Sequence, residues 1–210
     1  TSKIYCRQFM KEKYSKYSPK FIEINRDMLT NISSIFNEFN NDFVIKPNGL
    51  TGGKGVKIFN NNNKAALNYL KELFKSDSCV LLEERLKGEE FIQLSFCDGK
   101  SIKHMPIVKD FKRLNEDSDI NTGSMGSLIQ SNHKLNFLND NDLDEARYLN
   151  KEIMLELSKL HEYGYRGILY GSYMKTNNGV KLIEFNARFG DPEVIPILDL
   201  LETDLFDVFE

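Results

Sequence analysis

The sequence is poor in cysteine, histidine and long apolar runs, and each shortage narrows what the protein can be. Its three cysteines, Cys6, Cys79 and Cys97, are odd in number and form no CxxC pair, so we expect reduced thiols and a cytoplasmic protein. The three histidines have no spacing typical of a metal site. No apolar run approaches the roughly 20 residues that span a bilayer, and the first residues carry no signal-peptide pattern. The sequence therefore predicts no membrane partner.

The charge balance also gives no signal for a nucleic-acid partner. The formal net charge is -3 over 210 residues, with lysine and aspartate dispersed along the chain. This argues against a nucleic-acid-binding face and favours a local basic pocket for a small anion. A hydrophobic content of 40% is enough for a sizeable core. The chain starts at Thr1 without a methionine and stops inside a helical pattern, so we expect it to be part of a longer protein.

Helical and strand patterns alternate along the chain. Residues 109–127 look irregular, and residues 60–63 read as a surface turn without a function. The pattern predicts an α+β fold with largely antiparallel sheets. Helices are predicted over residues 3–13, 29–39, 63–74 and 143–164, the last stopped by Gly164, strands over 21–24, 43–47, 55–59 and 79–84, and hairpins over 88–108 and 166–186.

Four glycines and three lysines lie between two predicted strands, in the stretch KPNGLTGGKGVKIF. A Walker motif needs serine or threonine after its lysine and then a helix, whereas here Gly55 follows Lys54 and a strand comes next. The backbone N–H groups of Gly52, Gly53 and Gly55 could instead converge on an anion, while Lys46 and Lys54 neutralise a polyphosphate. From the loop alone, a glycine-rich hairpin with solvated lysines explains the pattern equally well.

A second polar pattern lies near the C-terminus, in KLIEFNARFGDPE. Glu184 and Asn186 are two apart on a predicted strand, so their side chains leave the same face. A carboxylate beside an amide oxygen suits Mg2+, which prefers oxygen ligands and bridges to nucleotide phosphates. Arg188 follows, where a guanidinium could bind phosphate or carboxylate through two hydrogen bonds. A polar strand end with a surface salt bridge is the alternative.

Five stretches together resemble the ATP-grasp superfamily, and within it the phosphoribosylamine-glycine ligases, also called glycinamide ribonucleotide synthetases. The stretches are SKIYCRQFM, VIKPNGLTGGKGV, EERLKGEE, NTGSMG and LIEFNARFGDPE, so the resemblance runs nearly end to end. The lysines and the E-x-N pair are shared by other ATP-grasp enzymes, whereas RFGDPE after that pair resembles these ligases in particular. The resemblance implies an ATP-grasp fold, with residues 1–84 as its first lobe and residues 85–210 as a second lobe that carries the metal and substrate motif.

The resemblance also implies how a nucleotide would be held. The adenine would lie against the backbone of Glu84 to Leu86, with Glu83 reaching its amino group and Glu90 the ribose hydroxyls. Lys46 and Lys54 would bind the phosphates. The implied ATP site comprises Lys46, Gly52, Gly53, Lys54, Gly55, Glu83, Glu84, Leu86 and Glu90, and the implied Mg2+ or Mn2+ ligands are Glu184 and Asn186.

The implied reaction joins glycine to 5-phosphoribosylamine in purine biosynthesis. The glycine carboxylate attacks the γ-phosphoryl of ATP, and the amine then displaces phosphate from glycyl phosphate, giving glycinamide ribonucleotide, ADP and phosphate. In such a mechanism, positioning and electrostatics carry the catalysis. The implied catalytic residues are Arg188, Lys54 and Asp110, and the implied substrate-binding residues are Asp110, Lys112, Arg113, Asn121, Thr122, Gly123, Arg188, Gly190 and Asp191.

Two positions depart from the pattern of these ligases. Phe111 stands where the family has a histidine in D-H-K-R, and Ser124 stands where it has the second glycine of NTGGMG. The acids Asp191 and Glu193 could bind the glycine amine or the metal, but Pro192 between them also suits the first turn of a helix and the acids its N-terminus. Neither the N-terminal nor the C-terminal domain of the family is in this sequence, so we expect both as partners.

Two other functions stay open at this point. One is an ATP-grasp ligase that uses a different acid or amine, which the departures at Phe111 and Ser124 would favour. The other is a nucleotide-binding module without ligase activity.

Overall fold

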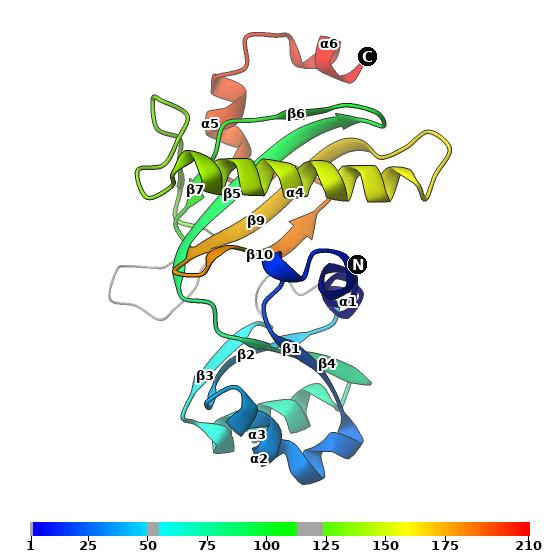
Figure 1. Cartoon of the computed structure of the whole chain (residues 1–210), viewed down its shortest axis with the longest axis vertical. Coiled ribbons are helices and arrows are strands. Elements are labelled where there is room, and N and C mark those ends of the chain that lie inside the picture. The colour runs from blue at the N-terminus through cyan, green and yellow to red at the C-terminus, as the bar shows by residue number, and fades with distance from the viewer. Residues whose placement is uncertain (1, 50–54, 113–123) are drawn as a thin grey trace. The chain divides into compact units, whose positions relative to one another are not determined.

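The computed structural model of the chain describes residues 2–49, 55–112 and 124–210. The chain divides into two compact units, Thr1–Lys87 and Gly88–Glu210, each with its own antiparallel sheet (Figure 1). The α+β class with antiparallel sheets is thereby confirmed. The predicted boundary after residue 84 lies at the end of the last strand of the first unit, whereas the division into units falls after Lys87. Among the described residues, no helix is long and apolar enough to cross a membrane.

The first unit is a four-stranded sheet with helices on both faces. Its strands are β1 (Phe21–Asn25), β2 (Asp42–Pro47), β3 (Lys57–Asn60) and β4 (Cys79–Glu84), in the order β1-β4-β2-β3. Figure 1 shows α1 (Lys3–Lys13) over one face, and α2 (Ile32–Glu38) and α3 (Asn63–Leu73) over the other. Two short 3-10 helices, Ser15–Tyr17 and Arg26–Asn31, complete the unit.

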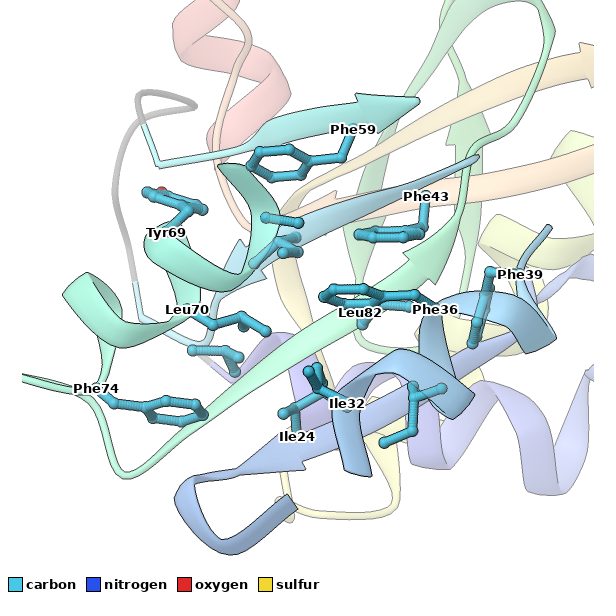
Figure 2. Packing of buried hydrophobic residues seen from close by; sticks show 14 residues of the cluster. Ile24, Ile32, Phe36, Phe39, Phe43, Phe59, Tyr69, Leu70, Phe74 and Leu82 are labelled. Atoms are coloured by element: carbon cyan, nitrogen blue, oxygen red, sulfur yellow. The ribbon is translucent and has the colours of Figure 1, made fainter. Parts of the chain in front are cut away.

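Alternation along β2 separates the core of this unit from its polar face. Phe43 and Ile45 are fully buried and join α2 and α3 in one hydrophobic cluster, where Phe36 stacks on Phe43 at 4.6 Å between ring centroids (Figure 2). Because successive side chains of a strand point to opposite faces, Lys46 leaves β2 on the face that α1 covers. Glu83 of β4 leaves on the same face, since it pairs with Val44.

The second unit is built on long strands that run antiparallel. Its main sheet has the order β10-β9-β5-β6, from β5 (Gly88–Asp98), β6 (Ile102–His104), β9 (Arg166–Thr176) and β10 (Gly179–Asn186). A two-stranded ladder joins β7 (Lys109–Asp110) to β8 (Ser127–Leu128). The helices are α4 (Asp140–Ser158), α5 (Val194–Asp199) and α6 (Leu205–Phe209).

The face of the second sheet that meets α4 is closed by a buried polar network. Asn150 of α4 donates to the carbonyl of Gln93 and to Ser95 Oγ, both at 3.0 Å, and accepts from the Tyr173 hydroxyl at 2.5 Å. Along β5, Gln93 and Ser95 therefore face α4, whereas Ile92 and the other even-numbered positions face away from it. The opposite face of the sheet therefore carries the side chains of these even-numbered positions.

Several local predictions need correction. The helix predicted over residues 29–39 is α-helical only over Ile32–Glu38, because the 3-10 helix Arg26–Asn31 precedes it. The long helix ends at Ser158, and Gly164 lies in the turn beyond it with a φ of +69°. The stretch 109–127 contains β7 and the start of β8, so it is not wholly irregular. Within the surface turn 60–63, Asn62 caps α3 by accepting from Ala65 N.

Candidate functional site

Three charged side chains meet on the α1 face of the first sheet. Lys46 Nζ lies 2.6 Å from Glu83 Oε2, and Arg7 of α1 holds the same carboxylate through Nε to Oε1 at 2.6 Å and Nη2 to Oε2 at 3.2 Å. Arg7 and Glu83 are each 2% exposed, and the Lys46 side chain is 12% exposed. We call this group the buried triad.

The buried triad joins two cations to one carboxylate. Burial alone would raise the pKa of the Glu83 carboxyl, but Arg7 and Lys46 lower it to about 2, so the carboxylate is charged at neutral pH. Removing one partner from a buried ion pair costs about 3–5 kcal/mol, because an uncompensated charge remains. The Glu83 oxygens predicted to reach adenine are thus engaged by Arg7 and Lys46, and the adenine contact stays a prediction.

Three other predicted nucleotide residues of the first unit are described by the structure: Gly55, Glu84 and Leu86. The Gly55 carbonyl accepts from the Tyr69 hydroxyl at 2.8 Å. Glu84 at the end of β4 accepts from Lys20 N at 2.8 Å through its side chain and donates its own N–H to the Lys20 carbonyl at 2.9 Å. Leu86 follows in an extended segment and is half-buried. The predicted residues Gly52, Gly53, Lys54, Arg113, Asn121, Thr122 and Gly123 lie outside the described residues.

In the second unit, four polar side chains lie side by side on the sheet face opposite α4: Glu90, Ser172, Glu184 and Asn186. Ser172 of β9 pairs with Glu184 of β10, and its hydroxyl donates to Glu90 Oε1 at 2.9 Å. Asn186 Nδ2 donates to Glu184 Oε1 at 3.2 Å, which confirms that these two side chains leave the same face. The arrangement joins three neighbouring strands in one polar patch.

A β-bulge decides which face receives Glu184. Leu182 pairs with Tyr173 and is buried under α4, so regular alternation would bring residue 184 to that same buried side. The register shifts between Leu182 and Glu184, and Glu184 pairs with Ser172 instead. Bulges re-aim side chains in this way, often beside functional sites. Glu184 is consequently exposed on the open face.

Lys112 links this patch to the segment after β7. Its amine forms a close ion pair with Glu90 and lies 3.9 Å from Asp110 Oδ2. Burial alone would lower the pKa of Lys112, but Glu90 and Asp110 raise it, so the amine stays charged. Burial raises the pKa of the Asp110 carboxyl, against the lowering effect of a 2.5 Å hydrogen bond from Ser124 Oγ. The Lys112 amine therefore lies among the carboxylates of Glu90, Asp110 and Glu184.

Gly190 marks a point of close approach beside this cluster. A Cβ there would lie 2.4 Å from Glu193 Oε2 and 2.8 Å from Tyr170 Cε2, so no larger residue fits without a shift. The buried Glu193 carboxylate accepts from the Tyr170 hydroxyl at 2.7 Å. Burial and then Glu193 raise the pKa of that hydroxyl. Glu193 occupies the N-cap position of α5, where its side chain makes no capping hydrogen bond.

A hollow of about 460 Å³ opens next to these residues, lined by Ser124, Met125, Gly126, Asp191 and Pro192. The predicted substrate residue Asp191 is exposed on it. Arg188 is also exposed, and its Nη1 donates to the Phe189 carbonyl at 2.7 Å. The structure thus brings Glu90, Asp110, Lys112 and Glu184 together, with Asp191 at the adjoining hollow.

Glu184 and Asn186 can supply only part of the ligand set of a hard divalent cation. Glu184 and Asn186 supply carboxylate and amide oxygens at an exposed position. Among the described residues no group of three or more His, Cys, Asp and Glu side chains could hold a metal ion. Mg2+ commonly keeps several waters and binds through one or two carboxylates plus substrate phosphates, so the pair is sufficient for that mode.

Sequence reasoning missed Arg7, Ser172 and Tyr170. For Arg7 a signal was available: it lies between Ile4 and Met10 on the buried stripe of α1, and a charged residue on such a stripe needs a buried partner. Ser172 and Tyr170 lie inside a long apolar strand. Only the cross-strand register brings Ser172 to Glu90, and Tyr170 meets Glu193 ahead of α5 across 23 residues of sequence.

Comparison with known proteins gives consistent matches over nearly the whole chain. Residues 1–194 match the family model of the phosphoribosylglycinamide synthetase ATP-grasp (A) domain. The phosphoribosylamine–glycine ligase of Methanococcus vannielii is 42% identical over 99% of this chain and 49% of its own length. That of Methanosarcina barkeri is 41% identical over 98% of this chain and 48% of its own length.

Solved structures agree on the fold. The phosphoribosylamine–glycine ligase of Thermotoga maritima superposes with a TM-score of 0.78 at 29% identity, over 95% of this chain and 50% of its own. D-alanyl-alanine synthetase A of Vibrio cholerae superposes with a TM-score of 0.76 over 99% of this chain and 61% of its own, but at 10% identity it supports the fold alone. The chain spans about half the length of the curated relatives it matches.

Proposed function

This chain belongs to the phosphoribosylglycinamide synthetase family, as its ATP-grasp domain, and we propose on that basis that it binds Mg-ATP and drives the ligation of glycine to 5-phosphoribosylamine in de novo purine biosynthesis. The observation that carries the proposal is the 41–42% identity to phosphoribosylamine–glycine ligases over nearly all of this chain. The flanking half of such a ligase would complete the substrate site. Cys6, Cys79 and Cys97 form no disulfide with one another, which accords with a cytoplasmic location.

The described residues support distinct roles in this reaction. Lys46 lies at the surface of the buried triad, where its amine would meet a phosphate oxygen. Glu184 and Asn186 would hold Mg2+, or Mn2+, which screens the phosphate charge when bound. Arg188 would meet charge that develops during transfer of the γ-phosphoryl group to the glycine carboxylate. Lys54 would contribute a second cation and lies outside the described residues.

The second unit supports substrate positioning. Asp110 and Lys112 form a charged pair beside the hollow that Asp191 lines, which suits recognition of an amino acid that carries both charges. Closing such groups around glycine would hold its carboxylate near the phosphoryl group, and this positioning supplies much of the rate. The amine of phosphoribosylamine would then attack glycyl phosphate, with release of phosphate and no covalent link to the protein.

A different acid or amine substrate is the second candidate. It is favoured by the hydrogen bond between Ser124 and Asp110, because a glycine at 124 could not make it. The two candidates differ in which amino acid triggers ADP release by the whole protein that carries this chain. Release with glycine and 5-phosphoribosylamine supports the first candidate. Release with another amino acid, and none with glycine, supports the second.

Nucleotide binding is testable on the chain itself by calorimetry with Mg-ATP. We expect Lys46→Met to weaken binding by about ten-fold, the loss of one charge-assisted contact. Lys64→Met is the matched control, because Lys64 is exposed on α3, on the other face of the sheet. No heat at millimolar Mg-ATP from the folded chain would refute the proposed nucleotide site.

A further inference from the structure

Arg7 is a buried cation that the proposed reaction does not use. It lies on α1 at 2% exposure and holds Glu83 through two hydrogen bonds of 2.6 and 3.2 Å. A guanidinium that binds one carboxylate in this paired geometry forms a strong and directional contact. Lys46, at 2.6 Å, shares Glu83 Oε2 with Arg7.

The sharing of Glu83 between Arg7 and Lys46 affects how well the Lys46 amine can attract an anion. A lysine paired with a single carboxylate is a neutral unit and attracts phosphate weakly. In the buried triad Glu83 is shared by two cations, so it neutralises Lys46 less than it would as the partner of that lysine alone. The side chains of Arg7 and Glu83 are each only 3% exposed, whereas the Lys46 side chain is 12% exposed. An anion from solvent would therefore meet the Lys46 amine first.

We propose that Arg7 is a positioning residue for the nucleotide phosphates: by neutralising Glu83 it keeps the charge of Lys46 available to an anion. The proposal rests on the proposed nucleotide site. It assigns Glu83 the role of an acceptor shared by both cations, with Arg7 supplying the counter-charge that Lys46 would otherwise supply alone. The low pKa of Glu83, about 2, agrees with a carboxylate that has two cationic partners.

The proposal makes opposite predictions for the two buried partners. Arg7→Met leaves Lys46 and Glu83 as a neutral pair, so phosphate binding should weaken by about ten-fold. Glu83→Gln removes the only anion of the triad, so phosphate binding should become tighter, by several-fold at low salt. The double variant Arg7→Met/Glu83→Gln keeps Lys46 charged without its carboxylate and should bind about as the unchanged chain does. If Arg7 only supported the fold, both single variants would bind more weakly.

The experiment is calorimetry on the 210-residue chain with two probes, tripolyphosphate and Mg-ATP. Tripolyphosphate carries the phosphate chain without a base, so any contact between Glu83 and adenine does not enter. Circular dichroism shows that each variant is folded at the temperature used. Lys11→Met is the matched control, because Lys11 is exposed on the same helix and its loss changes the net charge equally. It should leave both affinities unchanged.

The outcomes separate the inference from the function on which it rests. If the unchanged chain binds neither probe, the proposed nucleotide site fails and the inference fails with it. If it binds both probes and folded Arg7→Met binds equally well, the inference alone is overturned. If Arg7→Met does not fold, Glu83→Gln decides: tighter tripolyphosphate binding supports the inference, and unchanged or weaker binding overturns it.

Discussion

Acid should lower the stability of the first unit, because it protonates one buried carboxylate, that of Glu83. Arg7 and Lys46 lower its pKa to about 2 in the folded chain, against 4.5 for an ordinary glutamate. A carboxylate whose folded pKa is depressed contributes stability that is present above its unfolded pKa and is lost as the pH falls through its folded pKa. The loss should therefore extend from about pH 5 to about pH 2.

The size of the effect follows from the two pKa values. A gap of about 2.5 between them corresponds to about 3 kcal/mol, at about 1.4 kcal/mol for each factor of ten, and most of it should vanish between pH 6 and pH 2. Comparison with Glu83→Gln isolates this contribution, because glutamine does not titrate. We expect the difference in opening free energy between the unchanged chain and this variant to shrink by about 3 kcal/mol over that range.

Hydrogen exchange at the slowest amides of β2 and β4 measures this difference without assuming that both units unfold together. The two proteins are compared at the same pH, so intrinsic exchange rates cancel. Glu38→Gln serves as the control, because Glu38 is exposed and its amine partner on Lys20 is 3.9 Å away. Its effect should stay within about 0.5 kcal/mol at every pH. A Glu83 difference that stays constant within about 1 kcal/mol from pH 6 to pH 2 would refute the depressed pKa.

Three further predictions address the second unit. Glu184→Gln should weaken Mg-ATP binding by about ten-fold in calorimetry and leave metal-free ATP binding unchanged, because its partner Asn186 cannot hold the ion alone; equal losses would contradict a metal role. Ser124→Gly should raise the pKa of Asp110 in a carboxyl NMR titration, since the bond from Ser124 lowers it, and an unchanged pKa would argue against that bond. Asn150→Ala should cost about 3 kcal/mol in urea unfolding, because it removes three buried hydrogen bonds, and a loss below about 1 kcal/mol would show that the network is dispensable.

The periodicity of apolar residues was sufficient to predict most of the helices and strands. The helix predicted over residues 3–13 matches α1, and the strand predicted over 79–84 matches β4. In both, local pattern and tertiary burial agree, because Ile4 and Met10 form an apolar stripe and β4 is a continuous buried run. The long helix was predicted too far, since its sequence stays helical in character beyond Ser158 while the backbone turns at Gly164.

The candidate site was predictable only where its residues are close in sequence. Glu184 and Asn186 are two apart, so their shared face follows from strand geometry. The bulge that selects that face is not visible in the pattern, because Ile183 is an ordinary strand residue and the shift depends on pairing with β9. The contact between Arg7 and Glu83 spans 76 residues, and no local pattern connects them.

The two departures from the ligase pattern meet at one place in the fold, and their physical costs differ. Phe111 pairs with Met125 and Gly126 through backbone bonds of 2.7 and 3.0 Å, which any side chain permits. Phe111 is 44% exposed, and the Lys109 amine lies 5.7 Å from the centre of its ring, so the phenyl group places no demand on the core. Ser124 is different, because its hydroxyl bonds to Asp110 and accepts from Gly126 N at 3.0 Å, which ties the loop to a buried carboxylate. Of the two positions, Ser124 is therefore the one through which substrate preference at the adjoining hollow would change.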